Sequence, residues 1–82
     1  MNEITKKKNV AFWKIVGCID SCVDELQLLS CEKMIDNFYR LFEGKVNRDT
    51  LFEERRSLRI ASITKSIKFN PELVLELDYT LI

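Results

Sequence analysis

The chain has 82 residues, of which 46% are apolar, and its 13 lysines and arginines balance 13 aspartates and glutamates to a formal net charge of zero. With only two glycines and one proline beside so many apolar residues, it is too hydrophobic for a disordered or low-complexity segment. A chain this short builds one core, so residues 1–82 are expected to form a single small domain. Because such a domain buries only about 60% of its unfolded surface, a homodimer is one expectation.

The sequence contains no histidine, which removes the commonest general base and metal ligand. Its three cysteines, Cys18, Cys22 and Cys31, are too few for a four-cysteine metal site and lack the CxxC spacing of redox motifs. Cys18 and Cys22, one helical turn apart, are interpreted as small buried apolar groups. The chain also has no glycine-rich phosphate loop and no nucleophile motif. We therefore predict a protein that is not an enzyme, with no catalytic residues, no metal site and no cofactor.

Three lysines, Lys6 to Lys8, precede an apolar stretch at residues 10–19 and superficially resemble the start of a secretion signal. Lys14 and Asp20 break that resemblance, and the apolar run falls far short of the ~18 residues that a membrane span needs. The odd number of cysteines favours a reducing compartment. We therefore expect a cytoplasmic protein in which residues 1–8 form a flexible basic N-terminal arm.

Apolar residues from position 10 to position 29 recur at the spacing of one helix face, and a second series follows over residues 31–43. The first series is Phe12, Ile15, Val16, Ile19, Cys22, Val23, Leu26 and Leu29, and the second is Cys31, Met34, Ile35, Phe38, Leu41 and Phe42. Gly44 suits the left-handed cap of the second helix. Because Ser30 competes with helical hydrogen bonds, the chain is expected to turn at residues 29–31 and to form a helical hairpin.

A third helix is predicted to begin at Asp49 or Thr50, since Thr50 and Glu53 have the spacing of a capping box. The expected buried face contains Phe52, Ile60, Ile63 and Ile67 with Arg56 among them, while Leu51 and Leu58 project from the far side. Two apolar stripes on one helix indicate two neighbours.

The C-terminal part of the chain fits two patterns. Asn70 and Pro71 make a strong helix start, yet the residues from Leu73 onward alternate between apolar and polar, as in a half-buried strand. We therefore predict an all-α bundle of three to four helices. The alternative is an α+β fold, in which the helical hairpin is followed by a β-hairpin over residues 60–82.

Charge alternates along the chain, with +3, −4, +4 and −3 in four consecutive blocks, as expected if oppositely charged helices lie side by side. One alternative function is that of a transcriptional regulator whose basic segment 45–68 binds nucleic acid. Glu53 and Glu54 lie near the start of the helix that would contact phosphates, and the net charge is zero, so nucleic-acid binding is not the preferred hypothesis. A second alternative is a membrane-surface regulator that uses Lys6 to Lys8 beside Phe12 and Trp13.

Aromatic residues make up 10% of the chain, and a chain of this length is not expected to bury all of them. We predict a non-enzymatic protein-binding module that acts as an inhibitor, adaptor or regulator of a partner protein, a class that includes small proteins carried by phages. For Phe38 and Phe42, burial in the core is the competing interpretation. The candidate partner-binding residues are Trp13, Phe38, Tyr39, Arg40, Phe42, Arg55, Arg56 and Arg59.

Overall fold

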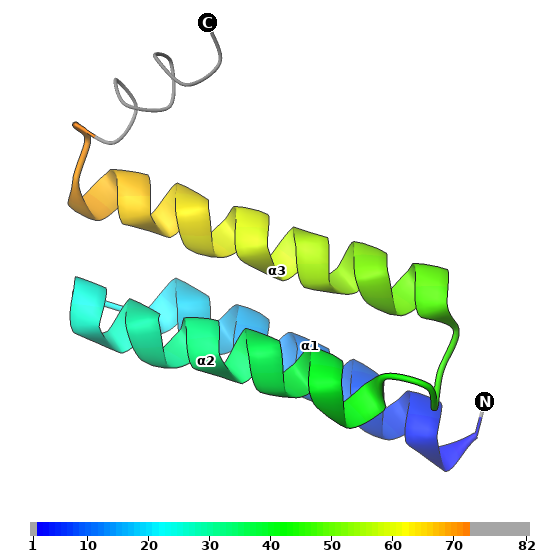
Figure 1. Cartoon of the computed structure of the whole chain (residues 1–82). Coiled ribbons are helices and arrows are strands. Elements are labelled where there is room, and N and C mark those ends of the chain that lie inside the picture. The colour runs from blue at the N-terminus through cyan, green and yellow to red at the C-terminus, as the bar shows by residue number, and fades with distance from the viewer. Residues whose placement is uncertain (1, 73–82) are drawn as a thin grey trace, which may run out of the picture.

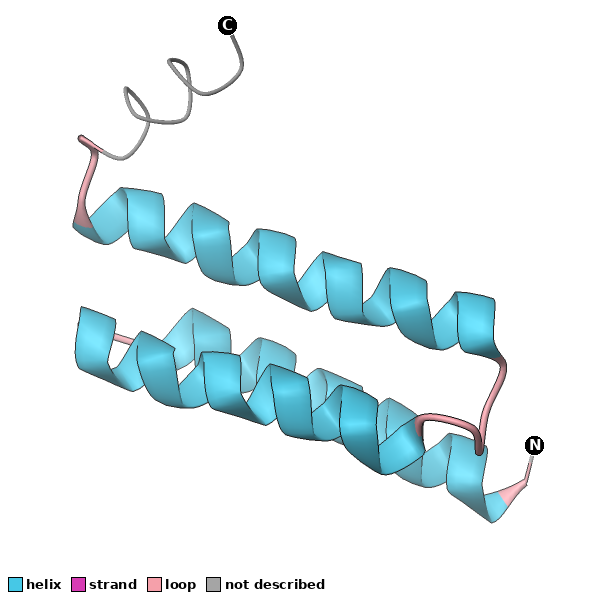
Figure 2. Cartoon of the chain, in the orientation of Figure 1, coloured by secondary structure: helices cyan, strands magenta, loops and turns pink. Residues whose placement is uncertain are grey.

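The computed structural model describes residues 2–72 and shows helix α1 over Glu3–Ser21, α2 over Glu25–Phe42 and α3 over Arg48–Phe69. The helices run in alternating directions, so that α1 and α2 form an antiparallel pair and α3 packs against both (Figure 1). Between residues 2 and 72 all regular structure is helical (Figure 2), which confirms the all-α prediction. Residues 60–69 belong to α3 and not to a strand. The predicted fourth helix or second strand after Pro71 lies outside the described residues.

Helix α1 starts earlier than the sequence pattern indicated. It begins at Glu3, so residues 3–8 are helical and differ from the flexible arm that was expected. Asn2 caps this helix, because the backbone N–H of Thr5 donates a hydrogen bond of 2.8 Å to Asn2 Oδ1. Lys8 is buried and forms an ion pair with Glu54 of α3. The cap and the ion pair together give the basic segment a fixed place in the bundle.

The turn of the helical hairpin lies at residues 22–24, so the predicted break at residues 29–31 is wrong, although the hairpin itself is confirmed. Asp24 is the N-cap of α2, since the backbone N–H of Gln27 donates to Asp24 Oδ1 at 2.9 Å. In return, the backbone N–H of Val23 donates to Gln27 Oε1 at 3.0 Å. This reciprocal pair satisfies N–H groups that a helix start leaves free, and it decides where α2 begins.

The connection between α2 and α3 contains Gly44, whose φ of 77° confirms its predicted left-handed conformation. Helix α3 then begins at Arg48, slightly before the predicted start at Asp49 or Thr50. Asn47 is the cap, because the backbone N–H of Thr50 donates to Asn47 Oδ1 at 3.0 Å. The sequence pattern therefore located this helix correctly but named the wrong capping residue.

The core lies where the three helices meet. Most of the stripe predicted for residues 31–43 is buried there, and so are the middle residues of the first stripe. Val23 and Leu26 are exposed instead, because the turn at residues 22–24 takes the chain out of the register of α1. The buried apolar cluster consists of Ile15, Ile19, Cys22, Leu28, Cys31, Ile35, Phe38, Phe42, Leu51 and Leu58.

The face of α3 that packs on the core is the opposite of the predicted one. Leu51 and Leu58 are 2% and 1% exposed, whereas Ile60 and Ile63 are 53% and 50% exposed and Phe52 is similarly open to solvent. The prediction that Phe52, Ile60 and Ile63 form the buried face is therefore wrong.

The reason is that the inner face of α3 is partly polar, and its polar groups are satisfied by remote parts of the chain. Ser62 is buried and donates a hydrogen bond of 3.2 Å to Glu32 of α2, while Lys65 Nζ donates to the carbonyl oxygen of Asp20 at 2.8 Å. Together with the ion pair between Lys8 and Glu54, these contacts allow polar groups to be buried on a face that also carries Leu51, Leu58, Ala61 and Phe69. The more apolar stripe of α3 is left on the outside.

Candidate protein-binding surface

Apolar side chains are exposed along the outer side of α3 and on the adjoining edge of α2. Each of Leu29, Phe52, Ile60 and Ile63 keeps about half of its area open to solvent. Charged residues from both helices lie among them. We call the set the α2–α3 surface; it comprises Leu29, Glu32 and Asp36 of α2 and Phe52, Arg56, Arg59, Ile60 and Ile63 of α3.

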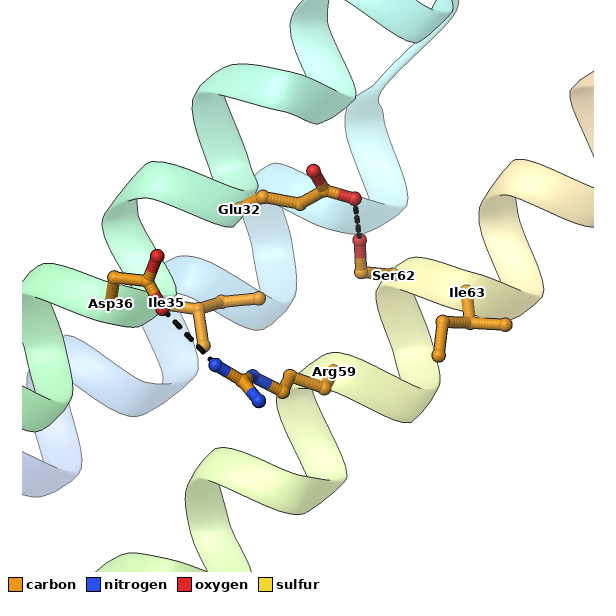
Figure 3. Close-up of a pocket in the computed structure, with 6 residues that line it drawn as sticks. All are labelled: Glu32, Ile35, Asp36, Arg59, Ser62 and Ile63. Atoms are coloured by element: carbon orange, nitrogen blue, oxygen red, sulfur yellow. Dashed lines mark hydrogen bonds and ion pairs between the residues drawn. The ribbon is translucent and has the colours of Figure 1, made fainter.

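A groove runs along the seam of this surface. A cavity of about 270 Å³ is lined by Glu32, Ile35 and Asp36 from α2 and by Arg59, Ser62 and Ile63 from α3 (Figure 3). A second hollow of about 300 Å³ shares Glu32 with the first and extends past Leu29 to Ser66 and Asn70. The two cavities together make a shallow trough between the helices, lined by apolar and polar side chains.

The two edges of the groove carry opposite charges. Glu32 and Asp36 line the α2 edge, and Arg59 on the α3 edge donates to Asp36 Oδ1 at 3.3 Å. Both side chains of this ion pair are more than half exposed, so it contributes little to the stability of the fold and is easily rearranged. The Arg55 guanidinium lies 4.0 Å from the centre of the Tyr39 ring and 5.1 Å from that of Phe52. Arg55 thus joins Phe52 to α2 by cation–π contacts.

The structure separates the candidate residues into three groups. Tyr39, Arg55 and Arg59 meet across the α2–α3 seam, and Arg40 and Arg56 are exposed on the same two helices. The other two candidates on α2, Phe38 and Phe42, belong to the buried core and lie apart from the α2–α3 groove, since they line a hollow between α1 and α2. Trp13 forms the third group.

Trp13 is 68% exposed on α1, and its ring packs edge-on against Phe12 with 5.3 Å between ring centres. Phe12 in turn contacts Phe38 in the core. Helix α1 contributes no residue to the lining of the groove, so Trp13 belongs to a different part of the molecule.

Leu29, Ile60 and Ile63 are surface residues that the sequence analysis assigned to the core. The sequence did indicate that α3 would expose apolar residues, because it shows two apolar stripes on this helix. Only one stripe can pack against α1 and α2, so the other has to face outward. The stripe that faces inward is determined by polar contacts such as the hydrogen bond between Ser62 and Glu32. These two residues are 30 positions apart, so a local sequence pattern does not reveal their contact.

Two observations bear on the alternative functions. Of the arginines that nucleic-acid binding would use, Arg55 lies against Tyr39, whereas Arg56 is exposed and Arg59 forms only an exposed ion pair with Asp36. Lys8, one of the three lysines of the membrane hypothesis, is buried against Glu54. Within residues 2–72, none of the helices combines the length and the apolar character that crossing a membrane requires.

Comparison of the chain with known protein families, with curated protein sequences and with solved structures finds no match.

Proposed function

We propose that this protein is a non-enzymatic protein-binding module, and that its α2–α3 surface binds an amphipathic helix of a partner protein. The observation that supports this most directly is the exposure of the more apolar stripe of α3, at Phe52, Ile60 and Ile63, beside a groove. A partner that covers it gains hydrophobic free energy of about 1 kcal/mol for each half-exposed side chain. In such a complex the protein acts as an inhibitor, adaptor or regulator of its partner.

The shape of the surface favours a helix as the occupant. When two helices have a shallow groove between them, a third helix can pack a ridge of its side chains into that groove. The buried residues Ile35 and Ser62 line the first cavity, and the half-exposed side chains of Leu29 and Ile63 contribute apolar area from the two helices. A helix lying there would extend the three-helix bundle to four helices.

The charges indicate the chemistry of the partner. Arg56 and Arg59 are exposed on α3, and Arg55 is half-buried one turn before Arg59. An apolar helix face flanked by acidic residues complements this arginine-rich edge, since carboxylates pair well with guanidinium groups. We therefore expect a partner helix with acidic residues on the side that faces α3.

The test is capture of proteins from the native cell extract, after nuclease treatment, by the tagged wild-type chain and by two variants. In the first variant, Ile60→Asp and Ile63→Asp place charges on the α2–α3 surface. In the matched control, Val10→Asp places a charge on the outer side of α1, at a residue of similar exposure. A specific partner is retained by the wild type and the control, and its affinity for the double variant falls by about tenfold or more. Far-UV circular dichroism verifies that all three proteins are folded.

The acidic chemistry of the partner is tested on the same captured protein. Arg56→Glu should weaken binding of the captured partner several-fold, and this loss of affinity should be larger at low salt.

Equal retention of the partner by the wild type and by the Ile60→Asp/Ile63→Asp variant would show that binding does not use this surface. Loss of the bound material on nuclease treatment would favour the nucleic-acid alternative instead.

A further inference from the structure

Two buried thiols face each other across the turn between α1 and α2. Cys22 Sγ and Cys31 Sγ lie 3.3 Å apart, and both residues belong to the buried core. Cys22 is the C-cap of α1, whereas Cys31 lies in the second turn of α2. The third cysteine, Cys18, is half-buried one turn earlier, and its carbonyl oxygen accepts a hydrogen bond from Cys22 Sγ at 3.1 Å. Cys18 and Cys22 were both expected to be small buried groups; Cys22 is buried, Cys18 is only half-buried, and the thiols in contact are those of Cys22 and Cys31.

We propose that Cys22 and Cys31 form a site of reversible oxidation, at which hydrogen peroxide converts the two thiols into a disulfide. The sulfur atoms already touch, so they need to approach by only about 1 Å to reach bonding distance. Cys22 has extended backbone angles (φ −62°, ψ 134°) at the end of α1, so its side chain can adjust without unwinding a helix.

The competing pairs are less favourable. Cys18 and Cys22 are one helical turn apart, where Cβ atoms are separated by about 5–6 Å, more than the ~3.8 Å of a disulfide. Cys18 is half-buried and contacts Cys22 through its carbonyl oxygen, whereas the sulfur of Cys22 contacts the sulfur of Cys31 directly. The geometry therefore selects one pair out of three thiols.

The reaction has two steps. In the first, the thiolate of Cys22 attacks one oxygen of the peroxide, the O–O bond breaks, hydroxide leaves and Cys22 becomes a sulfenic acid. In the second, Cys31 Sγ attacks the sulfur of Cys22, the S–O bond breaks, the S–S bond forms and the Cys31 proton leaves with the hydroxyl as water. Overall, the two thiols lose two electrons and two protons, and the peroxide is reduced to two molecules of water.

The order of the two steps follows from the surroundings of each thiol. Burial, with the neighbouring Cys22 as a further cause, raises the pKa of Cys31 from 9.0 to about 12, so Cys31 stays protonated and reacts slowly with peroxide. Cys22 is also buried, at 6% exposed, but it ends α1 directly before the exposed residues Val23 and Asp24 of the turn, so we place the first oxidation there. Cys22 is therefore the thiol that is oxidised first, and Cys31 resolves the sulfenic acid.

The test uses the full-length protein treated with hydrogen peroxide under native conditions, with remaining thiols blocked by iodoacetamide. Trypsin leaves all three cysteines on one peptide, because no lysine or arginine lies between Lys14 and Lys33. Cleavage after Glu25 separates Cys31 from the other two. The expected result is a loss of about 2 Da from the intact protein before alkylation and, after alkylation and digestion, a cross-linked pair of peptides with an alkylated Cys18.

Two variants assign the bond. Cys18→Ser should give the same cross-link in the same yield, and Cys31→Ala should give none and leave a Cys22 sulfenic acid that dimedone traps. If Cys31→Ala does not fold, the Cys18→Ser protein decides by itself. A disulfide that includes Cys18, a cross-link that forms only in denaturant, or oxidation of Cys18 with Cys22 and Cys31 still reduced would each overturn the proposal. Reduction with dithiothreitol should restore the original mass.

Discussion

Lys8 shows how strongly a single residue can depend on a distant partner. It is only 4% exposed, although lysine is almost never fully buried unless it is paired. Glu54, 46 positions further along the chain, supplies the opposite charge, and its side chain remains partly in contact with water. A local sequence pattern reveals neither the burial of Lys8 nor its pairing with Glu54. From the sequence alone, Lys8 is therefore assigned to a solvated basic arm.

Removal of one partner of this pair should destabilise the bundle. In Lys8→Met the carboxylate of Glu54 loses its partner while most of its surface stays covered, and we expect the free energy of unfolding to fall by about 2 kcal/mol. This is less than the ~3–5 kcal/mol of a completely buried pair, because Glu54 keeps some hydration. Urea denaturation followed by far-UV circular dichroism measures the change.

The double variant Lys8→Met/Glu54→Leu is the control. With both charges replaced by apolar groups of similar size, most of the lost stability should return. If the double variant were as unstable as Lys8→Met alone, the loss would come from packing of the lysine stem and not from the unpaired charge.

At the scale of the helix, the two glycines of the chain have opposite roles. Gly17 lies in the middle of α1 and is exposed, and a Cβ atom built there meets nothing within 4 Å. Gly44 lies in the α2–α3 connection with φ at 77°, a conformation that side chains with a Cβ rarely adopt. Space is open at both positions, so only the backbone conformation distinguishes them.

Alanine substitutions should therefore shift stability in opposite directions. Gly17→Ala should raise the free energy of unfolding by about 1 kcal/mol, because alanine loses less backbone entropy in a helix. Gly44→Ala should lower it by about 1–2 kcal/mol, since the left-handed conformation strains any residue with a Cβ. Thermal denaturation of the two variants beside the wild type measures both effects. A stabilised Gly44→Ala protein would mean that the connection can adopt another conformation.

The helix ends and faces also show what could be predicted from the sequence. The apolar spacing at Cys31, Ile35 and Phe38 is confirmed, because a buried face repeats with the helical period whatever its neighbours are. The turn was misplaced because Ser30 resembled a helix break, whereas Asp24 and Gln27 form the actual cap. A helix cap depends on a few hydrogen bonds, and several residues in this chain have side chains that could cap a helix. The sequence alone therefore does not identify which of them does.

The orientation of α3 could not be predicted for a different reason. Judged by its own residues, the stripe with Phe52, Ile60 and Ile63 is the more hydrophobic of the two. The helix turns the other way because Ser62 and Lys65 find acceptors on α2 and α1. The candidate surface was missed for the same reason, since its apolar residues had been assigned to the core.

For the whole molecule, the topology predicts fast folding. Within residues 2–72, three helices of alternating direction are joined by the short connections at residues 22–24 and 43–47 and make mostly local contacts. Helical bundles of this kind fold in microseconds to milliseconds, so we expect a single-exponential refolding phase with a time constant of about 10 ms or less. Continuous-flow mixing out of urea, followed by circular dichroism, measures it. A dominant phase lasting seconds would show that the described bundle forms only after a slow rearrangement.

The position of Trp13 has a spectroscopic consequence. It is the one tryptophan of the chain, and its indole ring is mostly hydrated in the folded protein. Its emission maximum should therefore lie close to that of free tryptophan and move little on unfolding, so intrinsic fluorescence is a poor reporter of denaturation. The same ring is a sensitive reporter of contact, because any molecule that covers the outer side of α1 displaces water from it and shifts the emission to the blue.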